Sequence, residues 1–435
     1  MTIQTITVIG ANGTMGRNIS GIFASFGSTK VYMVARNLEK AEAAKAKAAL
    51  SVKAGSVANR LVAADYSMLE TCVSESDLIF EAVFEDINIK KEVAQRVSKA
   101  MKPDAIACSG TSGLSITTLA EQYPEHLRSR FFGVHMFNPP YSLNLCELTP
   151  TQYSNMELCD ELEEYLSKVL YRTVVKVKDS PAFLGNRIGF QFINEVMQYA
   201  EKYKYSGGID YMDAILGCFS GRSMAPLVTA DFVGLDIHKA IIDNLYENTV
   251  DYAHETFVLP RFAEKLIAEG KLGKKAGGGL YKNVVYDNGL KSRTVYDICS
   301  DTYRDVMDYH FPYAEKMMKQ LHIGNYQDAF RILIENRSAE AELCLQFLLK
   351  YVIYSLMATE YVGYDIHSAD DVMATGFNWC PPLAIADALG TGTDFKQLVR
   401  DRLDKDVQDN INLEVVLASV VPSKYDYRPF FKAKR

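Results

Sequence analysis

A β-branched run passes directly into a glycine-rich loop in Thr5-Ile6-Thr7-Val8-Ile9-Gly10-Ala11-Asn12-Gly13-Thr14-Met15-Gly16, and a helical pattern follows. This order predicts a strand, a phosphate-binding loop and a helix. Glycines in such a loop permit a tight turn and let backbone N–H groups approach a pyrophosphate, while the helix N-terminus attracts the anion. A second apolar run, residues 31–34, follows at the distance of a βαβ unit. A glycine-rich turn without a ligand is the alternative. The expected dinucleotide site includes Gly10, Asn12, Gly13, Thr14, Met15 and Gly16.

Two details of this segment depart from the usual dinucleotide-binding pattern. Two residues, rather than one, separate Gly10 from Gly13. Where an acidic side chain would accept hydrogen bonds from the ribose 2′-hydroxyl, the chain has Ala35 followed by Arg36. An arginine there can bind a 2′-phosphate, whereas the alternative is an arginine that is simply exposed at a helix start. The cofactor expected from these residues is therefore NAD or NADP.

The following segments continue the alternation of strands and helices. Residues 77–84 read as a buried strand, and residues 87–101 read as an amphipathic helix rich in Lys and Glu. Glu85 and Lys90 fall where this strand gives way to this helix, near the edge at which open α/β sheets bind ligands. The next apolar run ends in Ser109-Gly110-Thr111-Ser112-Gly113. Such a loop either brings hydroxyl groups to a substrate or only makes a turn.

One histidine and one carboxylate lie on neighbouring short apolar runs. The first run continues as His135-Met136-Phe137-Asn138-Pro139-Pro140, and the second contains Glu147. Because the prolines prevent the strand from continuing, we expect the histidine at the end of the sheet, facing a cleft. This pair would supply a general base with an orienting carboxylate. A core histidine beside a solvated strand end is the alternative.

Six segments of the chain resemble, in the same order, the L-3-hydroxyacyl-CoA dehydrogenase family. Together they span most of the first 282 residues, and each is weak alone. The six segments are residues 10–16, 84–91, 109–114, 133–139, 178–187 and 270–282.

The resemblance implies reversible hydride transfer between a nicotinamide cofactor and C3 of a 3-hydroxyacyl-CoA, within fatty acid metabolism. His135 matches the family's general acid and base, and Glu147 matches its partner carboxylate. Ser112 and Asn186 match the side chains that hydrogen-bond the substrate oxygen. The family's cofactor contacts match Glu85, Lys90, Asn138 and Lys275 in this sequence. In the alternative interpretation, Lys90 and Lys275 are plain solvated side chains.

One segment departs from the family. Family members usually carry a long, lysine-rich helical hairpin after the second strand, which helps to bind CoA. Here only residues 38–64 occupy that place, as an alanine-rich helix. Its lysines either meet CoA phosphates or form a solvated face, so a non-CoA 3-hydroxy acid is the alternative substrate. These lysines are Lys40, Lys45, Lys47 and Lys53.

The second half of the chain contains an internal repeat. Residues 226–234 (PLVTADFVG) recur as residues 382–390 (PLAIADALG), and Gly207 corresponds to Gly363 at the same offset. Two copies at one fixed offset indicate a duplicated helical unit. In the family such units meet between subunits, and a chain with two copies can form that contact within itself. We therefore expect a monomer or a homodimer.

The expected fold is an α/β Rossmann-like domain followed by two tandem all-helical domains of the family's C-terminal type. The only tryptophan, Trp379, stands in a motif that is either a binding loop or a buried turn. The expected domains are residues 1–181 (dinucleotide-binding), 182–283 (first helical copy), 284–299 (linker or short hairpin) and 300–435 (second copy and tail).

Composition narrows the remaining alternatives. With 435 residues, 48% hydrophobic content and a net charge of −7, we expect two or three globular domains and no affinity for nucleic acid. The eight cysteines are scattered without paired spacing, which indicates reduced core thiols and no metal site. We find no cationic apolar leader and no apolar stretch long enough to span a membrane, so a cytoplasmic location is expected. A non-catalytic NADP sensor is the rival class, but it leaves Ser112, His135, Glu147 and Asn186 without a role.

Overall fold

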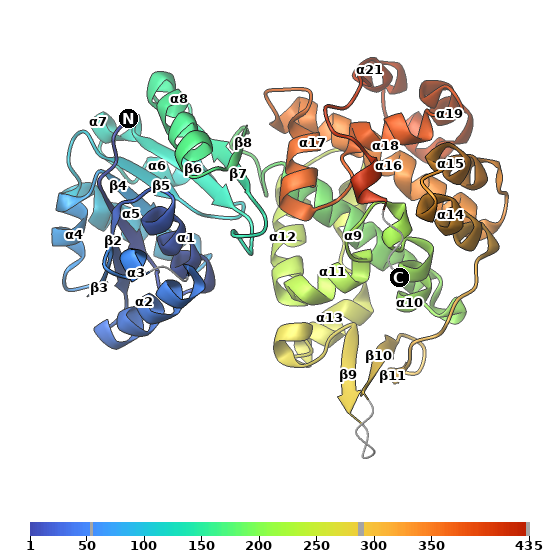
Figure 1. Cartoon of the computed structure of the whole chain (residues 1–435), viewed down its shortest axis with the longest axis horizontal. Coiled ribbons are helices and arrows are strands. Elements are labelled where there is room, and N and C mark those ends of the chain that lie inside the picture. Colours follow the sequence, from blue (N-terminus) through green and yellow to red (C-terminus); the bar gives the residue numbers. More distant parts are fainter. Residues whose placement is uncertain (53–54, 286–290, 432–435) are drawn as a thin grey trace. The chain divides into compact units, whose positions relative to one another are not determined.

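The computed structural model of the chain describes residues 1–52, 55–285 and 291–431 (Figure 1). It contains two compact units. The N-terminal unit comprises Met1–Phe183 with Val362–Tyr364, and the C-terminal unit comprises Leu184–Tyr361 with Asp365–Arg435. Lys53 of the expected lysine-bearing helix and residues 286–290 of the expected linker lie outside the described residues.

The N-terminal unit is built on one eight-stranded sheet in the order β3-β2-β1-β4-β5-β6-β7-β8. Strands β1 to β6 run parallel, β7 pairs antiparallel with β6, and β8 pairs parallel with β7. The expected Rossmann-like α/β fold is thereby confirmed. The strands are β1 (Thr5–Ile9), β2 (Lys30–Ala35), β3 (Leu61–Asp65), β4 (Leu78–Glu81), β5 (Ile106–Ser109), β6 (Phe131–Met136), β7 (Leu145–Thr149) and β8 (Thr173–Lys176).

Helices connect these strands. Helix α5 begins after Asp86, whose carboxylate accepts hydrogen bonds from the N–H groups of Asn88 and Ile89. Helix α1 begins after Gly13 and has no side-chain cap. The helices of this unit are α1 (Thr14–Ser25), α2 (Leu38–Val52), α3 (Gly55–Ala58), α4 (Leu69–Glu75), α5 (Ile87–Ala100), α6 (Ile116–Ala120), α7 (Glu125–Arg128), α8 (Met156–Glu164) and the π-helical turn η1 (Tyr165–Val169).

Strand β3 corrects the expectation that residues 38–64 form an alanine-rich helical segment. Only α2 and α3 of that segment are helical, and Leu61–Asp65 pairs in parallel with β2. Ala63 and Ala64 make this strand hard to predict from the sequence, because alanine is uncommon in strands. Pairing with a buried neighbour strand overrides that preference.

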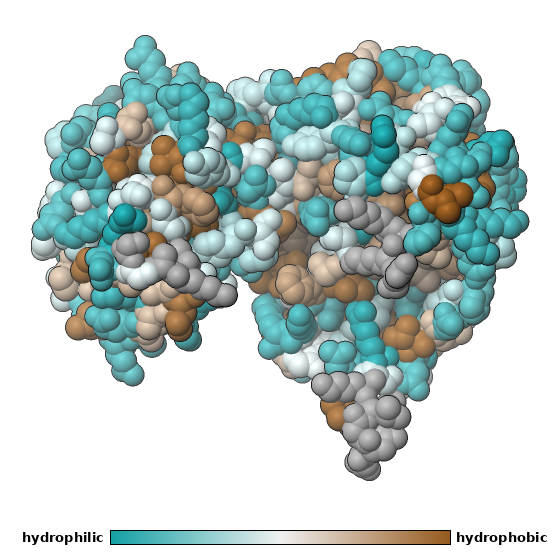
Figure 2. All heavy atoms as spheres, in the orientation of Figure 1, coloured by the Kyte–Doolittle hydropathy of each residue, from teal (hydrophilic) through white to brown (hydrophobic). Residues whose placement is uncertain are grey.

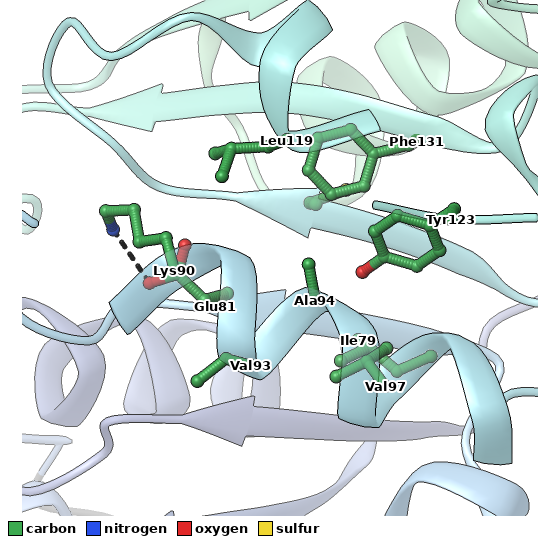
Figure 3. Close-up of a pocket in the computed structure, with 10 residues that line it drawn as sticks. Ile79, Glu81, Lys90, Val93, Ala94, Val97, Leu119, Tyr123 and Phe131 are labelled. Carbon is green, nitrogen blue, oxygen red and sulfur yellow. Dashed lines mark hydrogen bonds and ion pairs between the residues drawn. The ribbon is translucent and has the colours of Figure 1, made fainter. Parts of the chain in front are cut away.

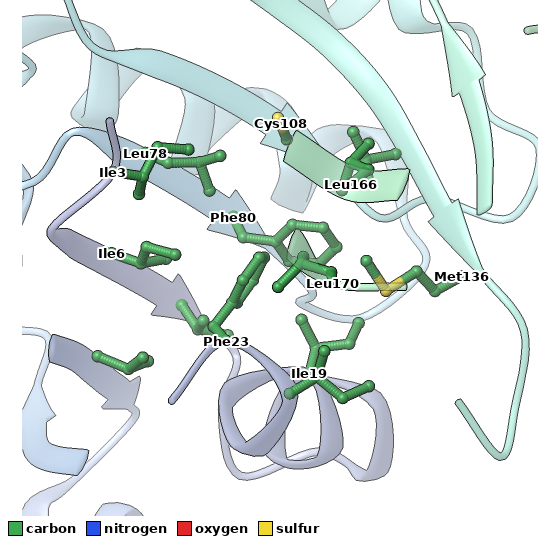
Figure 4. Packing of buried hydrophobic residues seen from close by; sticks show 14 of the residues in the cluster. Ile3, Ile6, Ile19, Phe23, Leu78, Phe80, Cys108, Met136, Leu166 and Leu170 are labelled. Atoms are coloured by element: carbon green, nitrogen blue, oxygen red, sulfur yellow. The ribbon is translucent and has the colours of Figure 1, made fainter. Parts of the chain in front are cut away.

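Large apolar side chains from both the sheet and its helices form the core of the N-terminal unit (Figure 4). Phe23 of α1 meets Phe80 of β4 edge to face, with ring centroids 5.8 Å apart. Both rings are buried, together with Ile6 of β1 and Leu170 after η1. This packing holds α1 against β1 and β4, and therefore fixes the loop that joins β1 to α1.

The C-terminal unit is mainly helical, but it also contains a three-stranded sheet in the order β11-β10-β9. The expectation of exclusively helical domains is wrong in this respect. Strands β9 and β10 pair antiparallel as a hairpin. The sequence left two alternatives for this segment, a linker or a short hairpin, and the structure has the hairpin. The strands are β9 (Tyr281–Val285), β10 (Lys291–Asp297) and β11 (Thr302–Asp305).

The helices of the C-terminal unit fall before and after this sheet. Those before it are α9 (Gly185–Lys202), η2 (Lys204–Ser206), α10 (Ile209–Ile215), η3 (Cys218–Ser220), α11 (Pro226–Val233), α12 (Leu235–Asn248), η4 (His254–Phe257), α13 (Arg261–Ala268) and η5 (Lys274–Ala276). Those after it are α14 (Pro312–His322), α15 (Tyr326–Glu335), α16 (Ala339–Val362), α17 (Ser368–Val372), η6 (Met373–Phe377), α18 (Pro382–Leu389), α19 (Phe395–Arg402), α20 (Lys405–Asp409), α21 (Leu413–Ala418) and η7 (Arg428–Phe430).

The two halves of the sequence repeat make matching hydrogen bonds. Asp213 accepts the N–H of Leu227 at 2.8 Å, at the start of α11. Asp370 likewise accepts the N–H of Leu383 at 2.9 Å, at the start of α18. In each half a buried carboxylate thus satisfies the first turn of a helix that begins with proline.

Helix α16 packs in the interior of the C-terminal unit. It is the one helix among the described residues that is long and apolar enough to cross a membrane, which corrects the expectation that no such stretch exists. However, 72% of its apolar window is buried within the structure. Phe347 and Tyr351 of α16 contact Phe192 of α9, and Trp379 packs on the same ring. Trp379 is only 1% exposed, so its motif is the buried turn and not a binding loop.

Most of the cysteines lie in the core. All eight cysteines are free; six are buried, Cys218 is half-buried and Cys299 is exposed, so the expectation of core thiols fails for Cys299.

Figure 2 shows hydrophilic residues interspersed with hydrophobic ones on the face of each unit that is in view. Scattered apolar side chains of this kind are normal for protein surfaces.

Candidate active site

The glycine-rich loop is closely packed between three strand ends. Gly10 has a φ of +83°, which favours glycine, and a Cβ added there would lie 2.5 Å from the carbonyl oxygen of Ala82. A Cβ on Gly16 would lie 2.5 Å from the carbonyl oxygen of Gly10. The N–H of Gly10 donates to the carbonyl of Val34 at 3.0 Å. The loop therefore connects the carboxyl ends of β1, β2 and β4, and helix α1 approaches it as closely as backbone allows.

The N-terminus of α1 fits an anionic group. Its cap residue Gly13 has no side chain to accept the first N–H groups of this 12-residue helix. Asn12 and Thr14 are exposed beside it, whereas Met15 is half-buried and packs against the core. Uncapped N–H groups and the helix dipole together provide the setting in which a pyrophosphate binds.

The end of β2 carries a positive and not an acidic side chain. Ala35 is buried and Arg36 is exposed. Burial raises the pKa of Tyr66, and the positive charges of Arg96 and Arg36 oppose this shift. The guanidinium group of Arg96 lies over the Tyr66 ring, 5.4 Å from its centroid. Asp65, opposite Ala35 in the sheet, is occupied by the N–H and hydroxyl of Ser67 at 2.9 and 2.6 Å.

His135 and Glu147 are directly opposite each other on the antiparallel strands β6 and β7. Nδ1 of His135 lies 2.7 Å from Oε2 of Glu147. The histidine is 4% exposed and the glutamate is 0% exposed. The rings of Phe137 and Phe183 flank the imidazole, with centroid distances of 4.5 and 5.6 Å. The carboxylate thus fixes one ring nitrogen in surroundings that are otherwise aromatic.

The end of β4, the loop after it and α5 carry a charged cluster, of which Figure 3 shows the ion pair of Lys90 with Glu81. Lys90 of α5 is 1% exposed, and its Nζ lies 2.8 Å from Oε1 of Glu81 and 3.3 Å from Oε2 of Glu85. Lys90 is therefore not a solvated lysine. Apolar side chains, including Val93 and Leu119, line the same pocket as this cluster.

The loop after β5 is held by the same carboxylates. Glu81 accepts the hydroxyl of Ser109 at 2.6 Å, and Glu85 accepts the hydroxyl of Thr111 at 2.5 Å and the N–H of Ser112 at 2.8 Å. Sequence reasoning missed Glu81, although an acidic residue that ends the apolar run of β4 is an unusual signal. The edge of the sheet that carries the glycine loop and His135 thus also carries Ser112.

The other predicted site residues are distributed over both units. Asn138 is exposed and follows β6 in the N-terminal unit. Asn186 is buried in the first turn of α9, and Lys275 lies in η5, where its Nζ is 2.5 Å from Oδ1 of Asp236. Both belong to the C-terminal unit, so neither lies in the unit that carries His135.

Groups of three or more His, Cys, Asp and Glu side chains that could hold a metal ion are absent from the described part of the chain. The titratable side chains grouped at the sheet edge instead make hydrogen bonds and ion pairs with one another. An imidazole held by a carboxylate, as in His135 and Glu147, can accept and return a proton.

Two family models match the chain. A model described as "3-hydroxyacyl-CoA dehydrogenase, NAD binding domain" matches residues 5–180. A second, described as "3-hydroxyacyl-CoA dehydrogenase, C-terminal domain", matches residues 183–283.

Relatives and solved structures agree with these models. A hydroxyacyl-coenzyme A dehydrogenase of mitochondria from Sus scrofa is 32% identical over 64% of this chain and 91% of its own length. A probable 3-hydroxyacyl-CoA dehydrogenase of Bacillus subtilis is 29% identical over 77% of this chain, and the chain spans only 42% of that relative. A solved 3-hydroxybutyryl-CoA dehydrogenase from Escherichia coli is 18% identical but has a TM-score of 0.70, and covers 96% of this chain and 99% of its own.

The solved structure shows that the shared fold extends beyond residue 283, into the second helical region. The two family models match only the part before it. On these matches, the chain belongs to the 3-hydroxyacyl-CoA dehydrogenase family.

Proposed function

We propose that this protein is an NAD(P)-dependent oxidoreductase that interconverts 3-hydroxyacyl-CoA and 3-oxoacyl-CoA. The observation that carries the proposal is the buried contact of 2.7 Å between Nδ1 of His135 and Oε2 of Glu147. It lies on the same sheet as the glycine loop, which fits a dinucleotide because Gly16 leaves no room for a Cβ and α1 has no side-chain cap. The names of the relatives support this class of reaction.

His135 moves the proton of the substrate oxygen. Since Nδ1 faces Glu147, the other ring nitrogen, Nε2, is the one that exchanges the proton with the oxygen on C3. In the oxidising direction Nε2 takes the hydroxyl proton, and Glu147 stabilises the imidazolium that forms. In the reducing direction the same nitrogen returns it. When bound, a nicotinamide cofactor supplies the hydride acceptor or donor.

Ser112 and Asn186 are the proposed hydrogen-bond partners of the substrate oxygen. A hydroxyl and an amide at that oxygen stabilise the negative charge that develops on it during reduction. Ser112 follows β5, whose Ser109 is paired with Gly133, two residues before His135 on β6. Its position at the ends of neighbouring strands supports this role.

The proposed cofactor is NAD or NADP. The backbone N–H groups of the loop from Gly10 to Gly16 would hold the pyrophosphate, and Glu85, Asn138 and Lys275 would contribute further contacts. The family model describes an NAD-binding domain. Arg36 favours a 2′-phosphate, because it is exposed where an acidic side chain would otherwise hold the ribose.

CoA is the proposed acyl carrier, and a non-CoA 3-hydroxy acid is the alternative. Lys40 and Lys47 are exposed on α2, and they offer positive charge to CoA phosphates. The test is to follow oxidation of NADH and NADPH with acetoacetyl-CoA and with free acetoacetate. Turnover of acetoacetyl-CoA is the expected result. Turnover of the free acid alone would replace the CoA proposal, and nucleotide binding without any turnover would favour the NADP sensor.

A monomer or a homodimer is the proposed state, with the small-molecule substrate as the partner and the cytoplasm as the location. Helices α9 and α16 of one chain contact each other through Lys350 and Glu195, whose Nζ and Oε1 lie 3.0 Å apart. A chain that joins these helices internally has less need of a second copy. Light scattering should give the mass of one or two chains, and an obligate tetramer would contradict it.

A further inference from the structure

Lys90 lies between the carboxylates of Glu81 and Glu85 in the N-terminal unit, and Figure 3 shows its ion pair with Glu81. Its ammonium group is 2.8 Å from Glu81 and 3.3 Å from Glu85, and only 1% of the residue is exposed. Apolar side chains such as Leu119 and Phe131 line the same pocket as Lys90 and Glu81. In such surroundings an ion pair is strongly coupled, and removing one partner leaves a charge that water cannot solvate.

The two carboxylates differ in position. Glu81 is the last residue of β4 and is buried, and its Oε1 also accepts the N–H of Val83 at 2.6 Å. Glu85 follows in the loop, and 42% of its side chain is exposed. Lys90 therefore ties the exposed carboxylate to the buried one.

Glu85 in turn holds the loop that carries Ser112. Its Oε1 accepts the hydroxyl of Thr111 at 2.5 Å and the N–H of Ser112 at 2.8 Å, and its Oε2 faces Lys90. The hydroxyl of Thr111 also accepts the N–H of Leu114 at 3.0 Å, which closes the turn. The chain of contacts thus runs from β4 through Lys90 and Glu85 to the backbone of Ser112.

We infer that Lys90 is a positioning residue for Ser112 and acts through Glu85, rather than through contact with the cofactor. Its ammonium group is turned toward two carboxylates and is buried, which leaves it poorly placed to meet a ligand directly. The inference rests on the proposed function, because it assumes that Ser112 hydrogen-bonds the substrate oxygen. Small displacements of such a group are costly, since catalysis depends on its alignment.

The test compares Lys90→Met, the double variant Glu81→Gln/Lys90→Met, and Lys99→Met, which removes an exposed lysine from the same helix. Three quantities are measured on the full chain: kcat with saturating acetoacetyl-CoA and cofactor, the Kd of the cofactor, and the melting temperature. Hydrogen–deuterium exchange of the peptide covering residues 109–114 gives a readout that is independent of activity.

For Lys90→Met we expect kcat at saturating cofactor to fall by about tenfold to a hundredfold, with a smaller change in the cofactor Kd that comes from the proposed contact of Glu85. The double variant removes both buried charges, so its melting temperature should recover while kcat stays low and the 109–114 amides exchange faster than in the unchanged protein. Lys99→Met should match the unchanged protein in every measurement.

Three results would overturn the inference. If kcat recovers together with the melting temperature, Lys90 serves only the stability of the fold. If the Kd of the cofactor rises while kcat at saturation is unchanged, Lys90 is a cofactor contact. If the 109–114 amides exchange at the unchanged rate, Lys90 does not position the loop. If the unchanged protein lacks turnover but the 109–114 amides exchange faster in the Lys90 variants than in it, the proposed reaction is refuted and the positioning of the loop by Lys90 is supported.

Discussion

Nδ1 of His135 and Oε2 of Glu147 lie 2.7 Å apart on directly opposed residues of two antiparallel strands. A fully buried carboxylate is costly unless it is paired, so the contact with the imidazole helps to stabilise Glu147 in the interior. The pairing fixes which ring nitrogen can exchange a proton with a substrate. The proposed role of this pair is proton transfer by His135.

Glu147→Gln should leave the histidine in place but lower kcat by about 10²-fold to 10⁴-fold, because an amide cannot stabilise the imidazolium. The cofactor Kd should change little. Steady-state kinetics and a fluorescence titration of the cofactor check both expectations. A kcat within threefold of the unchanged protein would remove Glu147 from the proposed mechanism.

Gly16→Ala should weaken cofactor binding and destabilise the fold by about 1–3 kcal/mol, because its Cβ would lie 2.5 Å from the carbonyl oxygen of Gly10. Gly392→Ala is the control, since a Cβ there meets nothing within 4 Å. Chemical denaturation gives the free energy of unfolding for each variant. Equal stability of the two variants would show that α1 can shift away from the loop at little cost.

Arg36→Leu should raise the KM for NADPH by about tenfold to a hundredfold, because the proposed charge-assisted hydrogen bond to the 2′-phosphate would be lost. The KM for NADH should hardly change. Lys99→Leu, which removes an exposed charge from α5 of the same unit, serves as the control. A strong preference of the unchanged protein for NADH would exclude this role of Arg36.

Asp213→Asn should flatten the dependence of stability on pH. Burial raises the pKa of Asp213 to about 7 from its usual 3.8, and hydrogen bonds from Tyr281 and from the backbone oppose the shift. The folded protein therefore binds this proton more tightly than the unfolded chain does. Its contribution to stability is complete below the unfolded pKa and is lost as the pH rises through the folded one.

Denaturation of the Asp213→Asn variant between pH 4 and pH 7 checks this expectation. The unchanged protein should lose up to about 1.4 kcal/mol more per pH unit than the variant does. Asp409→Asn, at an exposed position, should keep the steeper slope. Parallel curves for the unchanged protein and Asp213→Asn would mean that this carboxyl is not protonated in the folded state.

The sequence predicted the parts of the fold that depend on local pattern. The β1 strand, the glycine loop and α1 follow directly from their residues, as do β4 and α5. Strand β3 escaped notice because Ala63 and Ala64 favour a helix in isolation, and only the neighbouring β2 makes the segment a strand. The hairpin of β9 and β10 was one of two alternatives left open by the sequence, and β11 was missed because its four residues are mostly polar.

The contact between His135 and Glu147 was predictable from the sequence, but the contacts of Lys90 were not. His135 and Glu147 could be paired from their spacing, because adjacent antiparallel strands bring such positions together. The role of Lys90 could not be predicted from the sequence, because a lysine on an amphipathic helix normally faces water. Only the burial of its ammonium group against Glu81 and Glu85 distinguishes it.

The turnover of His135→Gln, measured together with its cofactor affinity, tests proton transfer by this histidine most directly. With acetoacetyl-CoA, we expect kcat to fall by at least about 10²-fold while the cofactor Kd stays within twofold, because glutamine cannot exchange the proton. His126→Gln, at an exposed position, should retain full activity. A His135→Gln variant that turns over at the unchanged rate would contradict the proposed mechanism.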